Sequence, residues 1–330
     1  MKKRNYGLDI FRILCCVGVL DYHIMGAALS GTGGGIDWYG KMLYYLAAFC
    51  VPGFFLMSGY FLGEREELEI KYVENKVLGI MKKLFGWIIF WTVVHFIRVG
   101  EVYDLWENLT GGAVSRGILP TAWFLFTYCF LMILGYPFYH LRKKYGSFFD
   151  IGVLIWMVIL ASGFGKSMMQ SCTQALWFHL YGGYFCLGMF FSRRMKSIEH
   201  MVKRKYQIVI VLCMNAICLA IYLFHVITDQ FAFTPNSYYG KWYYSLWLFF
   251  FFWLFSLVRV ENEVLQNLVS RMSSNALVTY LAPHLPTLYL LARIPLENAG
   301  MAVFLIILFF AGTQILAEGF RRIPLLRKLV

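Results

Sequence analysis

Residues 6–29 read YGLDIFRILCCVGVLDYHIMGAAL, an apolar run of membrane-spanning length that carries Asp9, Arg12 and His23. A charged side chain at the centre of a bilayer costs roughly 3 kcal/mol on insertion scales, so such residues usually serve a function. Eleven residues of α-helix turn through about 1100°, which puts Arg12 and His23 on one face, about 16 Å apart along the axis. Asp9, three residues before Arg12, shares that face. The stretch predicts a membrane helix with a polar stripe across most of the bilayer.

The rest of the chain has the composition of a helical membrane protein. Of its 330 residues, 60% are hydrophobic and 15% are charged, whereas about 25% are charged in a typical soluble domain. Apolar runs of about 20 residues recur, and the alternating pattern of an outer-membrane barrel is absent. We therefore expect an all-α, polytopic fold with one integral-membrane domain over residues 1–330 and no appended soluble domain.

Ten membrane spans account for the apolar runs. They are expected at residues 6–29, 42–62, 82–97, 120–140, 148–163, 175–191, 206–228, 241–258, 276–292 and 301–320. With a cytoplasmic N-terminus, the inner segments hold 23 of the 30 lysines and arginines, and the outer loops hold 6. Positive charge collects on the cytoplasmic side of membrane proteins. The sequence thus predicts cytoplasmic termini and a multi-pass protein of the cell (inner or plasma) membrane.

The charge and cysteine patterns exclude two other kinds of site. The net charge of +12 resides in short loops between apolar runs, which indicates membrane topology and contact with membrane lipids rather than nucleic acid. The eight cysteines form no CxxC pair and fall mostly inside apolar runs. We expect neither a metal site nor a disulfide framework.

The second span ends in VPGFFLMSGY, residues 51–60. Pro52 and Gly53 are expected to loosen the helix and free backbone groups that need partners. Ser58 and Gly59 are small residues suited to close helix contact. A packing seam and a ligand-lining segment are both compatible with this run.

Basic and aromatic residues elsewhere offer further binding groups. Residues 64–83 form an amphipathic, basic segment in which Lys76 and Lys83 suit anionic headgroups or a phosphorylated donor, with simple topology charge as the alternative. Trp123 opens the fourth span, where it serves either the aromatic belt or a sugar ring. The ninth span carries Tyr280 and His284 but is broken by prolines. Such a helix lines a cavity or is buried in protein, so His284 has a structural and a functional interpretation.

The combined pattern resembles the membrane acyltransferase type 3 family over the whole chain. The family's first signature is an arginine, ten residues and a histidine, after a Leu-Asp pair; here it is Leu8, Asp9, Arg12 and His23. The late Tyr-Leu-x-His motif is matched with one extra residue before the histidine. The remaining resemblances are FFLMSGY at 54–60, the basic Lys76 and Lys83, Trp123-Phe124-Leu125, and Tyr280-Leu281 with His284.

The resemblance implies an O-acyltransferase that moves an acyl group, often acetyl, from cytoplasmic acyl-CoA to a hydroxyl of a cell-envelope glycan or lipid-linked sugar. Acetyl-CoA is then a co-substrate, and no bound cofactor is expected. Arg12 would hold the donor phosphate or polarise the thioester carbonyl, and Asp9 would orient Arg12. His23 would act as general base. The remaining binding candidates are Ser58, Lys76, Lys83, Trp123, Tyr280 and His284.

Two other function classes stay open at this point. A charged stripe across the bilayer also suits a transporter of small, amino-acid-like molecules, although no internal repeat is visible. A structural partner of glycan-modifying machinery would leave Arg12 and His23 dispensable. A homo-oligomer is compatible with each of these classes.

Overall fold

The computed structural model describes residues 4–30, 37–100, 107, 118–162, 173–283, 298–324 and 326–330. Within these ranges all regular secondary structure is helical, which confirms the predicted all-α class. In chain order the elements are α1 (Tyr6–Ser30), α2 (Trp38–Leu46), η1 (Ala47–Phe49), α3 (Cys50–Gly63), α4 (Ile70–Val99), η3 (Pro120–Ala122), α6 (Trp123–Tyr145), α7 (Ser147–Ala161), α9 (Thr173–Met201), α10 (Arg204–Thr228), η4 (Pro235–Tyr238), α11 (Trp242–Leu257), α12 (Glu263–Ser274), α13 (Ala276–Leu281), α15 (Ala299–Arg322) and η5 (Leu326–Leu329).

Within the described residues, five helical segments are long and apolar enough to cross a membrane, as an integral membrane protein requires. Two shorter apolar helices, Ser147–Ala161 and Trp242–Leu257, also coincide with predicted spans. The ten-span count and the side on which each terminus lies stay predictions. The five long segments are Trp38–Gly63, Ile70–Val99, Pro120–Tyr145, Arg204–Thr228 and Ala299–Arg322.

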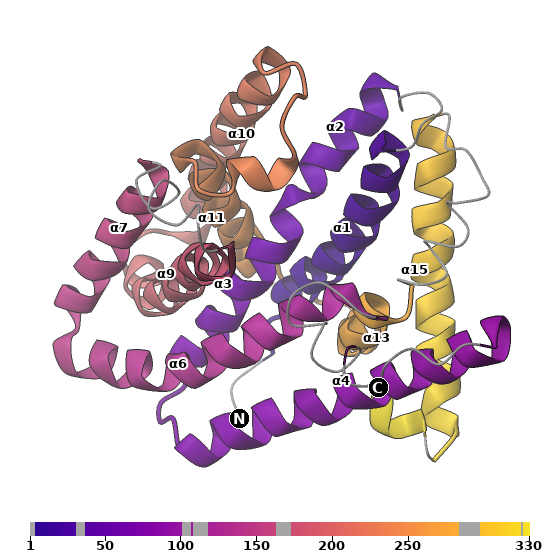
Figure 1. The fold of residues 1–330 in the computed structure, drawn as a ribbon. Coiled ribbons are helices and arrows are strands. Elements are labelled where there is room, and N and C mark those ends of the chain that lie inside the picture. The colour runs from indigo at the N-terminus through magenta and orange to yellow at the C-terminus, as the bar shows by residue number, and fades with distance from the viewer. Residues whose placement is uncertain are drawn as a thin grey trace.

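The first helix, α1, is surrounded by other helices. It packs against α2, α3, α11, α12, α13 and α15, and Figure 1 shows it between α2 and α15. At Gly18 an added Cβ would lie 2.9 Å from the Cβ of Cys50 on α3, so glycine permits the close approach there. Phe11 is fully buried, with its ring centroid 5.3 Å from that of Phe252 on α11. Packing on several sides fixes where the polar groups of α1 can lie.

Two glycines bring α3 and α9 into backbone contact. A Cβ at Gly59 would overlap the carbonyl oxygen of Phe185, and a Cβ at Gly188 would overlap the carbonyl oxygen of Leu56. Neither obstacle is a flexible side chain that could move aside. The close contact predicted at Gly59 is confirmed, with Gly188 on α9 as the matching small residue.

The helix distortion predicted at Pro52 occurs one turn earlier. A proline ring lacks an N–H and clashes with the carbonyl four residues before it, which is that of Ala48. There the chain tightens into the 3₁₀ turn η1, and the Ala48 carbonyl accepts a hydrogen bond from the Tyr244 hydroxyl at 2.9 Å. The hydroxyl of Tyr222 donates to the carbonyl of Tyr45 at 3.0 Å. Side chains of α10 and α11 thus supply partners for backbone groups inside the membrane.

The fourth helix, α4, begins at Ile70 and merges the basic segment with the third predicted span. Residues 70–83 contain no proline and one glycine, Gly79, so no strong stop signal separates the two parts. The helix packs against α6, and Figure 1 shows it running below α6. Its first half brings Lys76 and Lys83 to the same cavity as Arg12.

Candidate active site

Asp9, in the first turn of α1, is held by three side chains. Its Oδ1 accepts hydrogen bonds from Arg12 Nη1 at 3.1 Å and from Ser273 Oγ at 2.7 Å. Its Oδ2 accepts from Arg4 Nε at 2.5 Å, and this bond raises the pKa of the Arg4 guanidinium above its ordinary value. Asp9 is 4% exposed, so its charge is compensated inside the protein. These contacts are those that an orienting role toward Arg12 requires.

Ser273, near the end of α12, is a site residue that the sequence interpretation missed. Arg12 Nη1 donates to its Oγ at 2.8 Å, and the same Oγ donates to Asp9. Ser273 is 2% exposed. The available signal was the polar run 273–275 just before the broken ninth span. A serine there becomes informative only when the fold brings α12 against the start of α1.

The α12–α13 junction is fixed to α15 by a polar network. Asn275 Nδ2 donates to Gln314 Oε1 at 2.9 Å, and Gln314 Nε2 donates to the hydroxyl of Thr279 at 2.9 Å. Arg321 donates to Asn275 and, at 2.6 Å, to Glu318. Asn275 and Thr279 are each 1% exposed. The prediction that a polar, broken helix lines a cavity or is buried in protein is confirmed for the described half of it.

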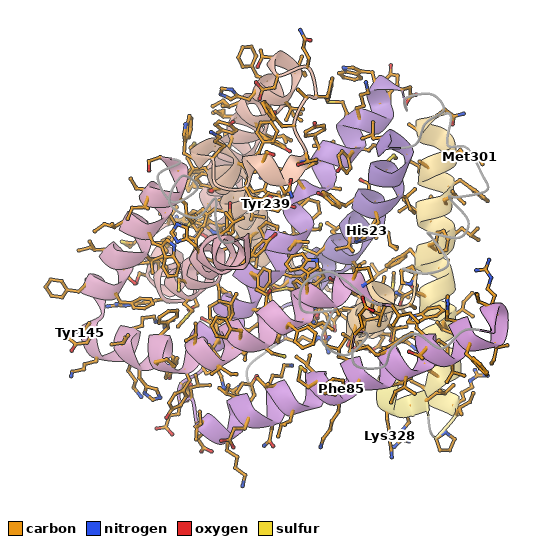
Figure 2. The ribbon with its side chains drawn as sticks, in the orientation of Figure 1. His23, Phe85, Tyr145, Tyr239, Met301 and Lys328 are labelled. Carbon is orange, nitrogen blue, oxygen red and sulfur yellow. The ribbon has the colours of Figure 1, made fainter. Side chains whose placement is uncertain are left out.

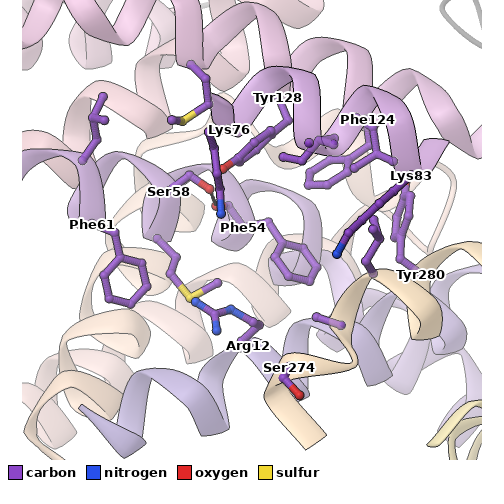
Figure 3. Close-up of a pocket in the computed structure, with 18 of the residues that line it drawn as sticks. Arg12, Phe54, Ser58, Phe61, Lys76, Lys83, Phe124, Tyr128, Ser274 and Tyr280 are labelled. Carbon is purple, nitrogen blue, oxygen red and sulfur yellow. Dashed lines mark hydrogen bonds between the residues drawn. The ribbon is translucent and has the colours of Figure 1, made fainter. Parts of the chain in front are cut away.

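A cavity of about 710 Å³ lies beside Arg12 (Figure 3), lined by residues of α1, α3, α4, α6 and the α12–α13 junction. Among the described residues its lining contains basic side chains and no acidic one. Aromatic and aliphatic side chains make up most of the rest. The basic residues are Arg12, Arg65, Lys76 and Lys83, and the apolar ones include Phe54, Met57, Phe61, Ile80, Phe124 and Leu277.

The basic side chains reach the cavity from three places. Arg12 is at its α1 side, with a side chain 27% exposed. Lys76 and Lys83 descend from α4 in Figure 3, and Lys83 also donates to the main-chain oxygen of Val330. Arg65 lies just past α3, its guanidinium 3.7 Å from the ring centroid of Tyr72. A cavity with this charge can hold an anion, and its apolar walls can hold an uncharged chain attached to that anion.

Other predicted residues lie in or next to the same cavity. Ser58 lines it, with its hydroxyl donating to the carbonyl of Phe54 at 2.6 Å. Tyr280 lines it as well and donates to the carbonyl of Thr121 at 2.6 Å. Trp123 is not among its described lining residues, because its ring stacks on Tyr181 with centroids 5.6 Å apart. The fold therefore gathers Arg12, Ser58, Lys76, Lys83 and Tyr280 around one space.

His23 lies farther along α1, away from that cavity. Figure 2 shows it on the part of α1 that is distant from α4. It is not one of the described lining residues of the cavity, and its side chain is exposed. Its ring centroid is 6.0 Å from that of Tyr22. The helix carries Arg12 and His23 at different depths, as their spacing predicts.

Two further expectations concern His284 and a metal site. His284 lies outside the described residues, and so does the second half of the predicted ninth span. In the described part of the chain, no three histidine, cysteine, aspartate or glutamate side chains are grouped to hold a metal ion.

The chain is similar to a known protein family. Residues 5–318 match the model of an acyltransferase domain, the type 3 acyltransferase family. The match covers α1, the α12–α13 junction and most of α15, and so includes every element that lines the cavity. No curated protein and no solved structure matches the chain.

Proposed function

Because the chain belongs to the acyltransferase 3 family of membrane enzymes, we propose that it transfers an acetyl group from acetyl-CoA on the cytoplasmic side to a hydroxyl on the other side of the membrane. The acceptor is a cell-envelope glycan or a lipid-linked sugar, and the protein resides in the cell membrane.

The cavity beside Arg12 is the observation that supports this donor. It gathers four basic side chains without an acidic one in its described lining, and coenzyme A is a polyanion through its phosphates. Guanidinium and ammonium groups bind phosphate by charge-assisted hydrogen bonds. The apolar walls suit the pantetheine arm that joins the phosphates to the thioester.

The separation of Arg12 from His23 assigns different roles to them in this proposal. They stand about 16 Å apart along α1, at 1.5 Å per residue. If the reacting thioester carbonyl lies at His23, Arg12 is too far away to contact it. We therefore assign Arg12 to the donor phosphates, with Asp9 and Ser273 as its positioning residues. Lys76 and Lys83 share the phosphates, while Ser58 and Tyr280 contact the arm.

The reaction itself is assigned to His23. The imidazole accepts the proton of the acceptor hydroxyl as the hydroxyl oxygen forms a bond to the thioester carbonyl carbon. The carbon–sulfur bond then breaks, and the leaving thiolate of coenzyme A takes up the proton. Histidine suits this task because it exchanges protons near neutral pH. Trp123 and His284 remain candidates for the acceptor side.

The test is acetyl-CoA turnover by the purified wild type and a His23→Ala variant, with mixed envelope glycans as acceptors and free coenzyme A as the readout. We expect turnover that depends on acceptor and is lost in His23→Ala. Absence of turnover with several acyl-CoA donors, together with uptake of a small molecule into vesicles, would instead support transport.

A further inference from the structure

A second cavity lies where α1 begins. Its volume is about 810 Å³, and the N-terminal ends of α1 and α10, the end of α11 and the segment 258–266 enclose it. Arg4, Arg204 and Arg259 line it, with Glu261 as its one acidic residue in the described lining. It does not share Arg12, Lys76 or Lys83 with the first cavity.

The three arginines differ in how far their charges are compensated. Arg4 uses Nε to bind Asp9, and Arg204 donates Nη2 to the carbonyl of Leu257 at 2.5 Å, a neutral group. Arg259 is exposed and has no ion-pair partner among the described residues. After Asp9 and Glu261 are counted against them, the cavity keeps a net positive charge. It is therefore suited to an anion.

The residues around this cavity are of the kind that surround a bound lipid headgroup. The amphipathic helix α12 starts beside it and has 12 residues, too few to span a bilayer, which takes about 20. Its Val264, Leu265 and Leu268 are 75%, 50% and 51% exposed. On α10, Val209 and Ile210 are 58% and 51% exposed. Exposed apolar residues next to an arginine cluster are the pattern of a helix lying in the membrane interface.

We propose that this second cavity binds the phosphate headgroup of an anionic phospholipid. Arg204 and Arg259 contact the phosphate, and the acyl chains run along the exposed apolar residues of α10 and α12. Residues 257–260 also line this cavity.

The lipid site connects to the donor site through one residue. Arg4 lines the second cavity, and it also lines a smaller cavity together with Asp9 and Arg12. The bond from Arg4 to Asp9 uses Nε, so it does not occupy the two terminal nitrogens of the guanidinium. A bound phosphate would hold Arg4 in place, and Arg4 would in turn hold Asp9 against Arg12.

The test measures lipid binding without any acyl donor, so its outcome does not depend on the enzymatic proposal. Wild type, Arg259→Gln, Arg259→Lys and the double variant Arg204→Gln/Arg259→Gln are placed in nanodiscs of phosphatidylcholine containing labelled phosphatidylglycerol. Each arginine near an anionic surface contributes on the order of a fivefold change in affinity. We expect roughly fivefold weaker binding in Arg259→Gln and roughly 30-fold weaker binding in the double variant. Arg259→Lys should bind almost as well as wild type.

Lys144→Gln is the matched control, because Lys144 is exposed at the end of α6 and lines neither large cavity. Its lipid binding should equal that of wild type. Any of the following would overturn the proposal: equal retention of phosphatidylglycerol and phosphatidylcholine, an equal loss in Lys144→Gln and Arg259→Gln, or displacement of the lipid by adenosine 3′,5′-bisphosphate. Displacement by this nucleotide would indicate that the cavity binds the nucleotide end of the acyl-CoA donor. A folded Arg259→Gln with unchanged binding would overturn it too.

Discussion

Replacing Ser273 by alanine tests whether the contact between α12 and α1 positions Arg12. The change removes one hydroxyl that donates to Asp9 at 2.7 Å and accepts from Arg12 at 2.8 Å. Hydrogen bonds to charged groups contribute about 1.5–3 kcal/mol each. The direct Arg12–Asp9 contact at 3.1 Å survives, and Arg12 is partly exposed. We therefore expect a loss of about 2 kcal/mol from the free energy of unfolding, less than two full bonds.

The assay is thermal unfolding in detergent, combined with acetyl-CoA turnover as a function of donor concentration. A positioning role predicts a raised KM for the donor, because a misplaced Arg12 binds phosphate less well. Ser162→Ala is the control, since Ser162 is exposed at the end of α7, does not line the cavity, and its hydroxyl donates to the carbonyl of Ile159 at 2.8 Å. If Ser273→Ala behaves like Ser162→Ala in both stability and KM, the positioning argument is wrong.

Three further changes test the packing and the cavity. Gly188→Ala would force a methyl group into backbone atoms of α3 and should cost at least about 2 kcal/mol of stability. Gly312→Ala places its new Cβ with nothing within 4 Å and should stabilise the protein by about 0.5–1 kcal/mol. Thermal unfolding compares the two variants, and equal effects on stability would contradict the account. Lys76→Gln should raise the donor KM about tenfold with kcat unchanged, as one phosphate contact contributes about 1.4 kcal/mol. Steady-state kinetics measure both constants, and a lower kcat with unchanged KM would contradict a donor-binding role for Lys76. Tyr244→Phe leaves the Ala48 carbonyl without its donor and should lower stability by about 1 kcal/mol without changing KM.

The position of α10 and the pairing within the first turns of α1 follow from local sequence. Hydrophobic runs and helix periodicity act over short distances, so the predicted span at 206–228 and α10 (Arg204–Thr228) nearly coincide. The pairing of Asp9 with Arg12 likewise depends on three-residue spacing within one helix. Pro52 also acts locally, since its effect reaches the carbonyl four residues before it.

Contacts between distant segments could not be read from the same patterns. Ser273 is 264 residues from Asp9 in the chain, and no periodicity links them. Gly188 becomes a partner of Gly59 only because α9 packs on α3. The lining of the cavity by Lys76 depends on α4 continuing through the basic segment and packing against α6. Trp123 shows the reverse case, because stacking on Tyr181 takes its ring out of the described cavity lining.

Equilibrium binding of coenzyme A to wild type, Arg12→Gln and His23→Ala tests the division of roles along α1 most directly. The account predicts that Arg12→Gln weakens the Kd at least about tenfold, as loss of a charge-assisted contact does. It predicts that His23→Ala keeps the wild-type Kd while losing acyl transfer. Equal weakening in both variants, or no binding of coenzyme A to the wild type, would contradict it.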